Sequence, residues 1–255
     1  MITAGVDVGA KTIKIIILKG DRVIGQTIIP AGYDVQESTK AAWADVLPKA
    51  GVGFDQIDRI LSTGAGRKEV AEAHDRITEV SAAARGAIAL DPRIRTVIDV
   101  GAEEGRAIMI NADGQVLDFA INEKCAAGTG AFTEAMARAL EVTIEQLGPL
   151  SLLSTKAVAM NAQCAVFAES ELVTLVHSQT PKPDMARAVH DAIADRIVSL
   201  VRRVGMEKEV LLIGGVARNV GFVDSLKREL DMEIFIPETP ETVSAYGAAL
   251  LAAGQ

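Results

Sequence analysis

Short apolar runs rich in β-branched residues alternate with longer amphipathic stretches along the whole chain. The short runs end at glycine, aspartate or proline and have the length of buried strands. The longer stretches place apolar residues three or four positions apart, which is the spacing of helices. This alternation predicts an α/β protein. The strands we expect cover residues 2–8, 12–18, 22–29, 57–62, 96–100, 106–111, 116–121, 210–213 and 233–236, and the helices cover 37–50, 80–90, 130–140, 165–177, 184–204, 222–230 and 243–253.

One strand–turn–strand unit occurs twice in this pattern. The run GVDVGAKTIKIII, which begins at Gly5, is echoed by IDVGAEEGRAIMI, which begins at Ile98. Such a duplication predicts two related α/β halves. We place a first lobe at residues 1–92 and a second at 93–255, and we expect the final helix, 243–253, to pack back on the first lobe.

Both copies carry the turn Asp-Val-Gly-Ala, at Asp7 and again at Asp99. A glycine lets the backbone approach a phosphate closely, and consecutive N–H groups form an anion site. An aspartate can hold Mg²⁺ through water. A single turn of this kind is often only a turn, but two matched copies indicate a pair of phosphate clamps. We expect both aspartates to hold Mg²⁺ and to take part in catalysis. The residues expected to bind the phosphates are Gly9, Ala10, Lys11, Thr12, Gly101 and Ala102.

A third glycine element follows the strand at 210–213, in the run LIGGVARN. Glycine there allows a flat ring such as adenine to lie against the backbone, so Gly214, Gly215, Val216 and Asn219 are candidate adenosine contacts. The chain has neither the Rossmann glycine spacing nor a P-loop. The three elements, in this order, resemble the nucleotide motifs of the actin/sugar-kinase/Hsp70 superfamily. That resemblance implies two RNase H-like lobes with ATP or ADP in a cleft between them.

The chain has two cysteines, and each precedes a predicted helix, 130–140 after the first and 165–177 after the second. A helix N-terminus favours a thiolate over a thiol, so Cys125 and Cys164 are candidate metal ligands. Two buried, inert cysteines are the plainer interpretation. A [4Fe–4S] cluster takes four thiolates, which two chains with two cysteines each would supply. Zinc could use the same four sulfurs.

The segments around the cysteines, KCAAGTGAF and CAVFAESE, resemble those of a known family. The family comprises 2-hydroxyacyl-CoA dehydratase activators and the ATP-binding subunits of benzoyl-CoA reductase. STGAGR, RVG, IGGVARN and YGAALLA occur in the family's order as well. The resemblance implies a [4Fe–4S] cluster shared between two subunits, with Cys125 and Cys164 as this chain's ligands. We add Gly128, Thr129 and Gly130 to the cofactor-binding residues.

The family resemblance also implies an activity and partners. ATP hydrolysis would drive low-potential electrons from ferredoxin to a component that reduces or dehydrates an acyl-CoA. The cluster partner would be a sister subunit or a second copy of this chain. Homodimeric activators usually have Gly-Gly-Gln-Asp after the second Asp-x-Gly strand, where this chain has Gly-Ala and then Glu103 and Glu104. That departure looks more like the D-type subunit of benzoyl-CoA reductase, an enzyme of anaerobic aromatic degradation. We therefore expect an electron-activating subunit of the benzoyl-CoA reductase type, with a homodimeric dehydratase activator as the alternative. Both glutamates are candidate catalytic residues.

The composition of the chain excludes some other classes of function. The net charge of −8 gives no attraction to phosphate backbones, so we expect no nucleic-acid partner. We see no signal peptide and no apolar run of the ~18–20 residues that span a membrane, and we expect a cytoplasmic protein. Two rival functions stay open: a small-molecule kinase of the same superfamily, and a nucleotide sensor without turnover or iron.

Overall fold

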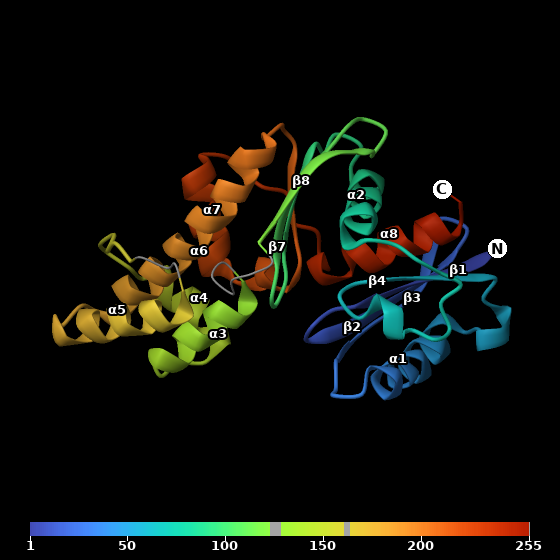
Figure 1. Ribbon diagram of the computed structural model, residues 1–255, viewed down its shortest axis with the longest axis horizontal. Coiled ribbons are helices and arrows are strands. Elements are labelled where there is room, and N and C mark those ends of the chain that lie inside the picture. Colours follow the sequence, from blue (N-terminus) through green and yellow to red (C-terminus); the bar gives the residue numbers. More distant parts are fainter. Residues whose placement is uncertain (123–128, 161–163, 255) are drawn as a thin grey trace. The chain divides into compact units, whose positions relative to one another are not determined.

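The computed structural model describes residues 1–122, 129–160 and 164–254, and it has the expected alternation of strands and helices (Figure 1). The strands are β1 (Ile2–Val8), β2 (Thr12–Lys19), β3 (Arg22–Pro30), β4 (Arg59–Thr63), β5 (Asp75–Arg76), β6 (Thr96–Val100), β7 (Gly105–Ile110), β8 (Val116–Asn122) and β9 (Val210–Ile213). The helices are α1 (Val35–Ala50), α2 (Glu79–Leu90), α3 (Gly130–Ala139), α4 (Ile144–Ser151), α5 (Ala165–His177), α6 (Lys182–Val204), α7 (Val220–Leu230) and α8 (Val243–Ala252). Among these helices, none combines the length and the apolar character that a membrane span requires.

Two sheets repeat one strand order, which confirms the duplication expected from the sequence. The first sheet has the order β3-β2-β1-β4-β5 and the second has β8-β7-β6-β9. In the first sheet β1 is antiparallel to β2 and parallel to β4. In both sheets, therefore, the strand that ends in Asp-Val lies between its hairpin partner and a strand from later in the chain.

The chain divides into two compact units, and the first comprises Met1–Val97, Ile108–Asp118 and Glu238–Gln255. One face of its sheet packs on α1, where Trp43 lies among Val6, Ile13 and Ile15. The opposite face packs on α8, whose small residues lie against β1, β2 and β4. Helix α8 also packs on α2.

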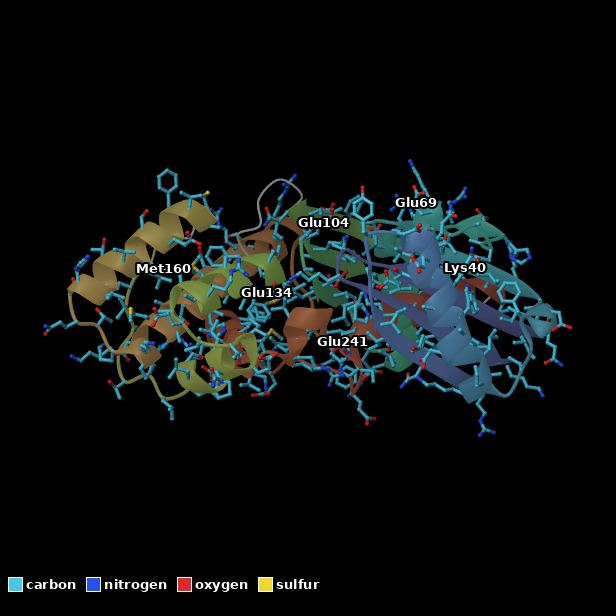
Figure 2. All side chains as sticks on the ribbon, turned by 90° about the horizontal axis from the view of Figure 1, so that it is seen from below. Lys40, Glu69, Glu104, Glu134, Met160 and Glu241 are labelled. Carbon is cyan, nitrogen blue, oxygen red and sulfur yellow. The ribbon has the colours of Figure 1, made fainter. Side chains whose placement is uncertain are left out.

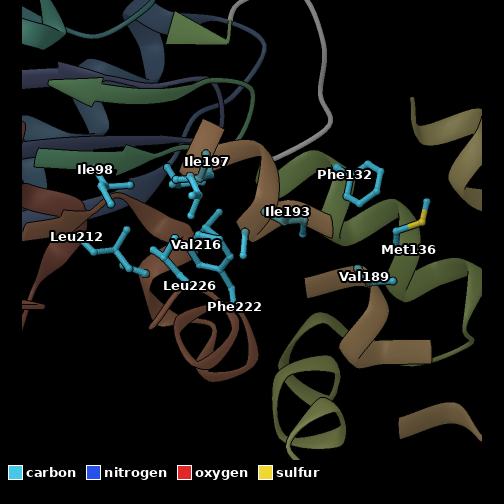
Figure 3. Packing of buried hydrophobic residues seen from close by; sticks show 14 of the residues in the cluster. Ile98, Phe132, Met136, Val189, Ile193, Ile197, Leu212, Val216, Phe222 and Leu226 are labelled. Carbon is cyan, nitrogen blue, oxygen red and sulfur yellow. The ribbon is translucent and has the colours of Figure 1, made fainter. Parts of the chain in front are cut away.

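The second unit comprises Ile98–Ala107 and Phe119–Pro237. Its core joins the strand residues Ile98 and Leu212 to the helices α3, α6 and α7, as Figure 3 shows. Phe132 of α3 and Phe222 of α7 are fully buried in this cluster. Helix α3 also packs on α5, the helix that follows Cys164.

Three details differ from the expected elements. The predicted strand at 233–236 forms only an isolated bridge, between Phe235 and Leu211, rather than a ladder. Helix α4 is not predicted by the pattern, since Gly148 and Pro149 both oppose helix formation. Thr143 begins that helix with a capping box to Gln146, which offsets part of this cost. The short strand β5 extends the first sheet beyond β4.

Candidate functional site

The first Asp-Val-Gly-Ala turn closes the hairpin between β1 and β2. The amide of Gly9 donates to the carbonyl of Thr12 at 3.0 Å. Asp7 is 8% exposed, and its Oδ2 lies 3.1 Å from Nζ of Lys14 on the paired strand. Ala10 and Lys11 are exposed at the turn. The turn therefore presents backbone amides, one carboxylate and one ammonium group within a few residues.

The second turn, between β6 and β7, repeats this arrangement. The amide of Gly101 donates to the carbonyl of Glu104 at 2.9 Å. Asp99 is 7% exposed, and its Oδ2 accepts a hydrogen bond of 3.0 Å from Nη1 of Arg106. Arg106 is also paired with the carboxylate of Glu104, which lies beside the strands of the second sheet in Figure 2. Glu103 is exposed, and Ala102 is half-buried at the same turn.

The two turns share a spacing that suits phosphate and Mg²⁺. In each copy the cation comes seven residues after the aspartate, Lys14 after Asp7 and Arg106 after Asp99. Oxygen ligands suit Mg²⁺, and ammonium and guanidinium groups suit phosphate oxygens. Each turn thus brings together a carboxylate and a cation of the kinds that suit a hydrated metal–phosphate complex. The two aspartates lie in different units.

A glycine from the neighbouring strand segment packs on each aspartate turn. Gly64, which follows β4, has φ +93°, and a Cβ there would lie 2.3 Å from the carbonyl oxygen of Val8. Gly214, which follows β9, has φ +91°, and a Cβ there would lie 2.3 Å from the carbonyl oxygen of Val100. Only glycine tolerates both this φ and this approach. Gly214 therefore supports the second turn, next to Asp99.

The other residues assigned to adenine lie in the segment that leads into α7. A Cβ on Gly215 would meet no atom of the other described residues within 4 Å. Val216 is buried in the core of the second unit. Asn219 caps α7, because its Oδ1 accepts hydrogen bonds from the amides of Gly221 and Phe222, at 3.0 and 3.2 Å. Their contact with a nucleotide stays a prediction.

The second turn is tied directly to the start of α3. The amide of Gly130 donates to the carbonyl of Gly101 at 3.0 Å, and the amide of Ala131 donates to that of Ala102 at 2.8 Å. Thr129, the residue before the helix, is fully buried. A movement of this turn must therefore strain or move the first residues of α3.

The structure describes one of the two cysteines. Cys164 is a partly exposed free thiol directly before α5, and its carbonyl accepts the amide of Ala168 at 2.9 Å. Cys125 and Gly128 lie outside the described residues. Within the described ranges, no three His, Cys, Asp or Glu side chains are grouped as for a metal ion. Cys164 lies at a helix N-terminus, as the sequence predicted.

Several residues at the two turns are not among the site residues predicted from the sequence. Arg106 and Gly64 are not among the predicted site residues, although alignment of the two repeats would have paired Arg106 with Lys14. Thr63 is also absent from that prediction, and it lies in register with Asp7 on the adjacent strand β4. Its sequence context, the end of an apolar run, gives no hint of a polar neighbour.

Comparison with known proteins decides the family. The model of the BadF/BadG/BcrA/BcrD ATPase family matches residues 4–252. The chain belongs to this ATPase family. The match covers both aspartate turns and both cysteine positions, so the resemblance stated from the motifs is confirmed at family level.

The similar proteins include two dehydratase activators. The (R)-2-hydroxyglutaryl-CoA dehydratase activating ATPase of Acidaminococcus fermentans is 36% identical over 98% of this chain and 96% of its own. The solved activator of the 2-hydroxyisocaproyl-CoA dehydratase from Clostridium difficile, with bound ADPNP, is 36% identical. It has a TM-score of 0.92 and covers 99% of this chain and 94% of that one.

The expected preference for the D-type pattern is corrected by these identities. The D-type polypeptide of benzoyl-CoA reductase from Thauera aromatica is 28% identical over 98% of this chain and 92% of its own, less than either activator. The local pattern around Glu103 and Glu104 is a poor guide, because it covers a few residues of one turn. A glucokinase from Streptomyces griseus, with a TM-score of 0.58 and 13% identity over the full length of both chains, shares the fold alone.

Proposed function

We propose that this ATPase-family chain is the ATP-driven activator of a 2-hydroxyacyl-CoA dehydratase. A second copy would complete a [4Fe–4S] cluster between the two chains. The observation that carries the proposal is the repeated set of aspartate, glycine turn and cation, in a chain 36% identical to two such activators. The activators' greater identity favours this role over that of a benzoyl-CoA reductase component.

In this proposal the two turns bind the phosphates of Mg²⁺–ATP. The backbone of the exposed turn residues Ala10, Lys11 and Glu103 would face the phosphate oxygens, because the amides of Gly9 and Gly101 are bonded within their own hairpins. Asp7 and Asp99 would hold water molecules of the metal. Mg²⁺, when bound, neutralises charge that develops on the phosphates. Lys14 and Arg106 are the adjacent cations, and each exchanges part of its carboxylate contact for a phosphate oxygen.

The two glutamates of the second turn have different roles in this proposal. Glu104 is engaged by Arg106 and is therefore a structural partner of that guanidinium. Glu103 is exposed at the same turn and is available to orient the attacking water. We assign it the role that a glutamine takes in the homodimeric activators.

The link from Gly101 to Gly130 gives hydrolysis a route to the cluster. The second turn changes its ligands when the terminal phosphate leaves, and α3 is bonded to that turn through two backbone amides. Helix α3 begins five residues after Cys125 and packs on α5, which begins after Cys164. Nucleotide state and cysteine geometry are thereby coupled, which requires different nucleotide affinity in two conformations.

The cysteines of two chains would hold the cluster, which supplies a one-electron carrier when bound. Cys125 and Cys164 provide two thiolates, and α5, which begins directly after Cys164, favours the charged form of that thiol. The chemistry of this donor set fits an iron–sulfur cluster and needs the second copy. A ferredoxin-type protein is the electron donor, and the dehydratase component is the acceptor.

An activation assay tests this function. The anaerobically purified chain is mixed with a strong reductant and a 2-hydroxyacyl-CoA dehydratase component, and dehydration is followed with ATP or with ADPNP. We expect dehydration with ATP and none with ADPNP or with an Asp7→Asn variant. An ATP-binding, cluster-loaded chain that activates no dehydratase but supports a benzoyl-CoA reductase component would transfer the assignment to that enzyme.

A further inference from the structure

The hydroxyl group of Thr63 has no hydrogen-bond partner among the residues that the structure describes. Thr63 is the last residue of β4 and is 0% exposed. Buried hydroxyl groups are almost always bonded, because the bond to water lost on burial must be replaced. An unpartnered one next to a proposed ligand site therefore needs an explanation.

The strand register places Thr63 beside Asp7. Asp7 pairs with Lys14 on β2 and with Thr63 on β4. Residues directly opposite one another on paired strands point to the same face of the sheet. The three side chains thus form one row across three strands, with the carboxylate in the middle.

The carboxylate of Asp7 extends towards both ends of this row. Its Oδ2 is paired with Nζ of Lys14 at 3.1 Å. Its Oδ1 lies at the Thr63 end, since a Cβ built on Gly64 would come within 2.6 Å of it. Asp7 is accordingly the charged acceptor that lies directly opposite Thr63 on the paired strand. The hydroxyl of Thr63 is buried and not accessible to water.

The second turn lacks a hydroxyl group at the position of Thr63. The hydroxyl is therefore not required for the packing of the duplicated unit. The residue before Gly214 is Ile213, where Thr63 stands before Gly64. Both glycines pack on their turns in the same manner. The polar group is therefore an addition to the first turn alone.

We propose that Thr63 is a positioning residue for Asp7 in the nucleotide-bound state. When Lys14 turns in part to the phosphates of Mg²⁺–nucleotide, its ion pair with Asp7 is weakened. The Thr63 hydroxyl then donates to Oδ1 and holds the carboxylate against the water shell of the metal. This inference rests on the proposed function, because it needs a nucleotide that draws Lys14 away.

The test compares three variants by calorimetric binding of ADPNP, with Mg²⁺ and with EDTA, and by thermal unfolding without nucleotide. Thr63→Val removes the hydroxyl and keeps the shape, and Thr63→Ser keeps the hydroxyl. Thr3→Val is the matched control. Thr3 lies on the same face of β1 as Asp7, and its hydroxyl donates to the carbonyl of Ala249 at 2.9 Å. That contact is independent of nucleotide.

We expect Thr63→Val to bind Mg²⁺–ADPNP about tenfold more weakly, as for one lost bond to a charged group, and to match wild type in EDTA. Its unfolding temperature without nucleotide should not fall, whereas that of Thr3→Val should fall with affinity unchanged. Thr63→Ser should restore affinity. Wild-type affinity in Thr63→Val, an equal loss in EDTA, or a fall in its unfolding temperature like that of Thr3→Val overturns the inference. A wild-type chain that binds no ADPNP overturns the proposed function itself.

Discussion

Lys14 lies 3.1 Å from Asp7 across two paired strands, and both side chains are about nine-tenths buried. The pair sits at the glycine turn that ends β1, where a phosphate-binding site is expected. A charge in this position is stabilised by its partner and poorly solvated without it. The same relationship recurs at the second turn, between Arg106 and Asp99.

Replacement of Lys14 by methionine should destabilise the protein, because it leaves a nearly buried carboxylate without its cation. We expect a loss of about 1–3 kcal/mol in the free energy of unfolding, measured by urea denaturation. Lys49→Met is the control, since the Lys49–Asp45 pair is exposed and should contribute less than about 1 kcal/mol. The double variant Asp7→Asn, Lys14→Met should recover part of the loss. A Lys14 variant as stable as the Lys49 variant would contradict the account.

Replacement of Gly64 by alanine should disrupt the first turn. The new Cβ would strain a backbone with φ +93° and also clash with the carbonyl of Val8, so we expect a loss above about 3 kcal/mol. Gly20→Ala separates the two effects, because Gly20 has φ +64° and open space around it. That control should cost about 1 kcal/mol. Equal unfolding temperatures of the two variants would show that the close approach is unimportant.

Much of the fold follows from local patterns in the sequence. The packing of Gly64 and Gly214 against the two turns does not. The two Asp-Val-Gly-Ala turns predict both hairpins, since glycine and the flanking apolar runs are local signals. Gly64 and Gly214 come from strands distant in sequence, and their approach to the turns depends on strand pairing that no local pattern specifies. The segment around Phe235 is an overprediction. Its apolar run has strand propensity, but in the structure only one residue of it pairs with another strand.

The two glutamates of the second turn should differ in their effect on ATP hydrolysis. Glu103→Ala removes the side chain proposed to orient the attacking water and should lower the steady-state ATPase rate about a hundredfold with unchanged ADPNP affinity. Glu103→Gln places the residue of the homodimeric activators there and should keep most of the activity. Glu104→Gln removes a partner of Arg106 and should act mainly on stability or affinity. A Glu103→Ala variant with wild-type ATPase activity would contradict the assignment.

His190 should make stability depend on pH. Its side chain is fully buried, and burial lowers its pKa from 6.5 to about 4, while the nearby charge of Asp191 opposes the shift. The unfolded chain therefore binds a proton between pH 6.5 and about 4 that the folded chain excludes, so stability falls as pH falls through this window. The loss should approach about 3 kcal/mol.

Denaturation by urea at about pH 7.5 and about pH 4.5 measures this dependence. The quantity to compare is the change in unfolding free energy between the two pH values, for wild type and for His190→Met. The wild type should lose more stability than the variant, and the exposed His177, changed to methionine, should behave like wild type. The same loss in His190→Met as in wild type would show that other groups cause the dependence.

The shared cluster is tested most directly by iron analysis of the anaerobically purified protein, together with its mass in solution. The account predicts about two iron atoms and two sulfides per chain in a dimer, which is one four-iron cluster for every two chains. Cys125→Ala and Cys164→Ala should each lose this iron and keep ADPNP binding. A chain that binds ADPNP without iron, or a monomer with four iron atoms, would contradict it.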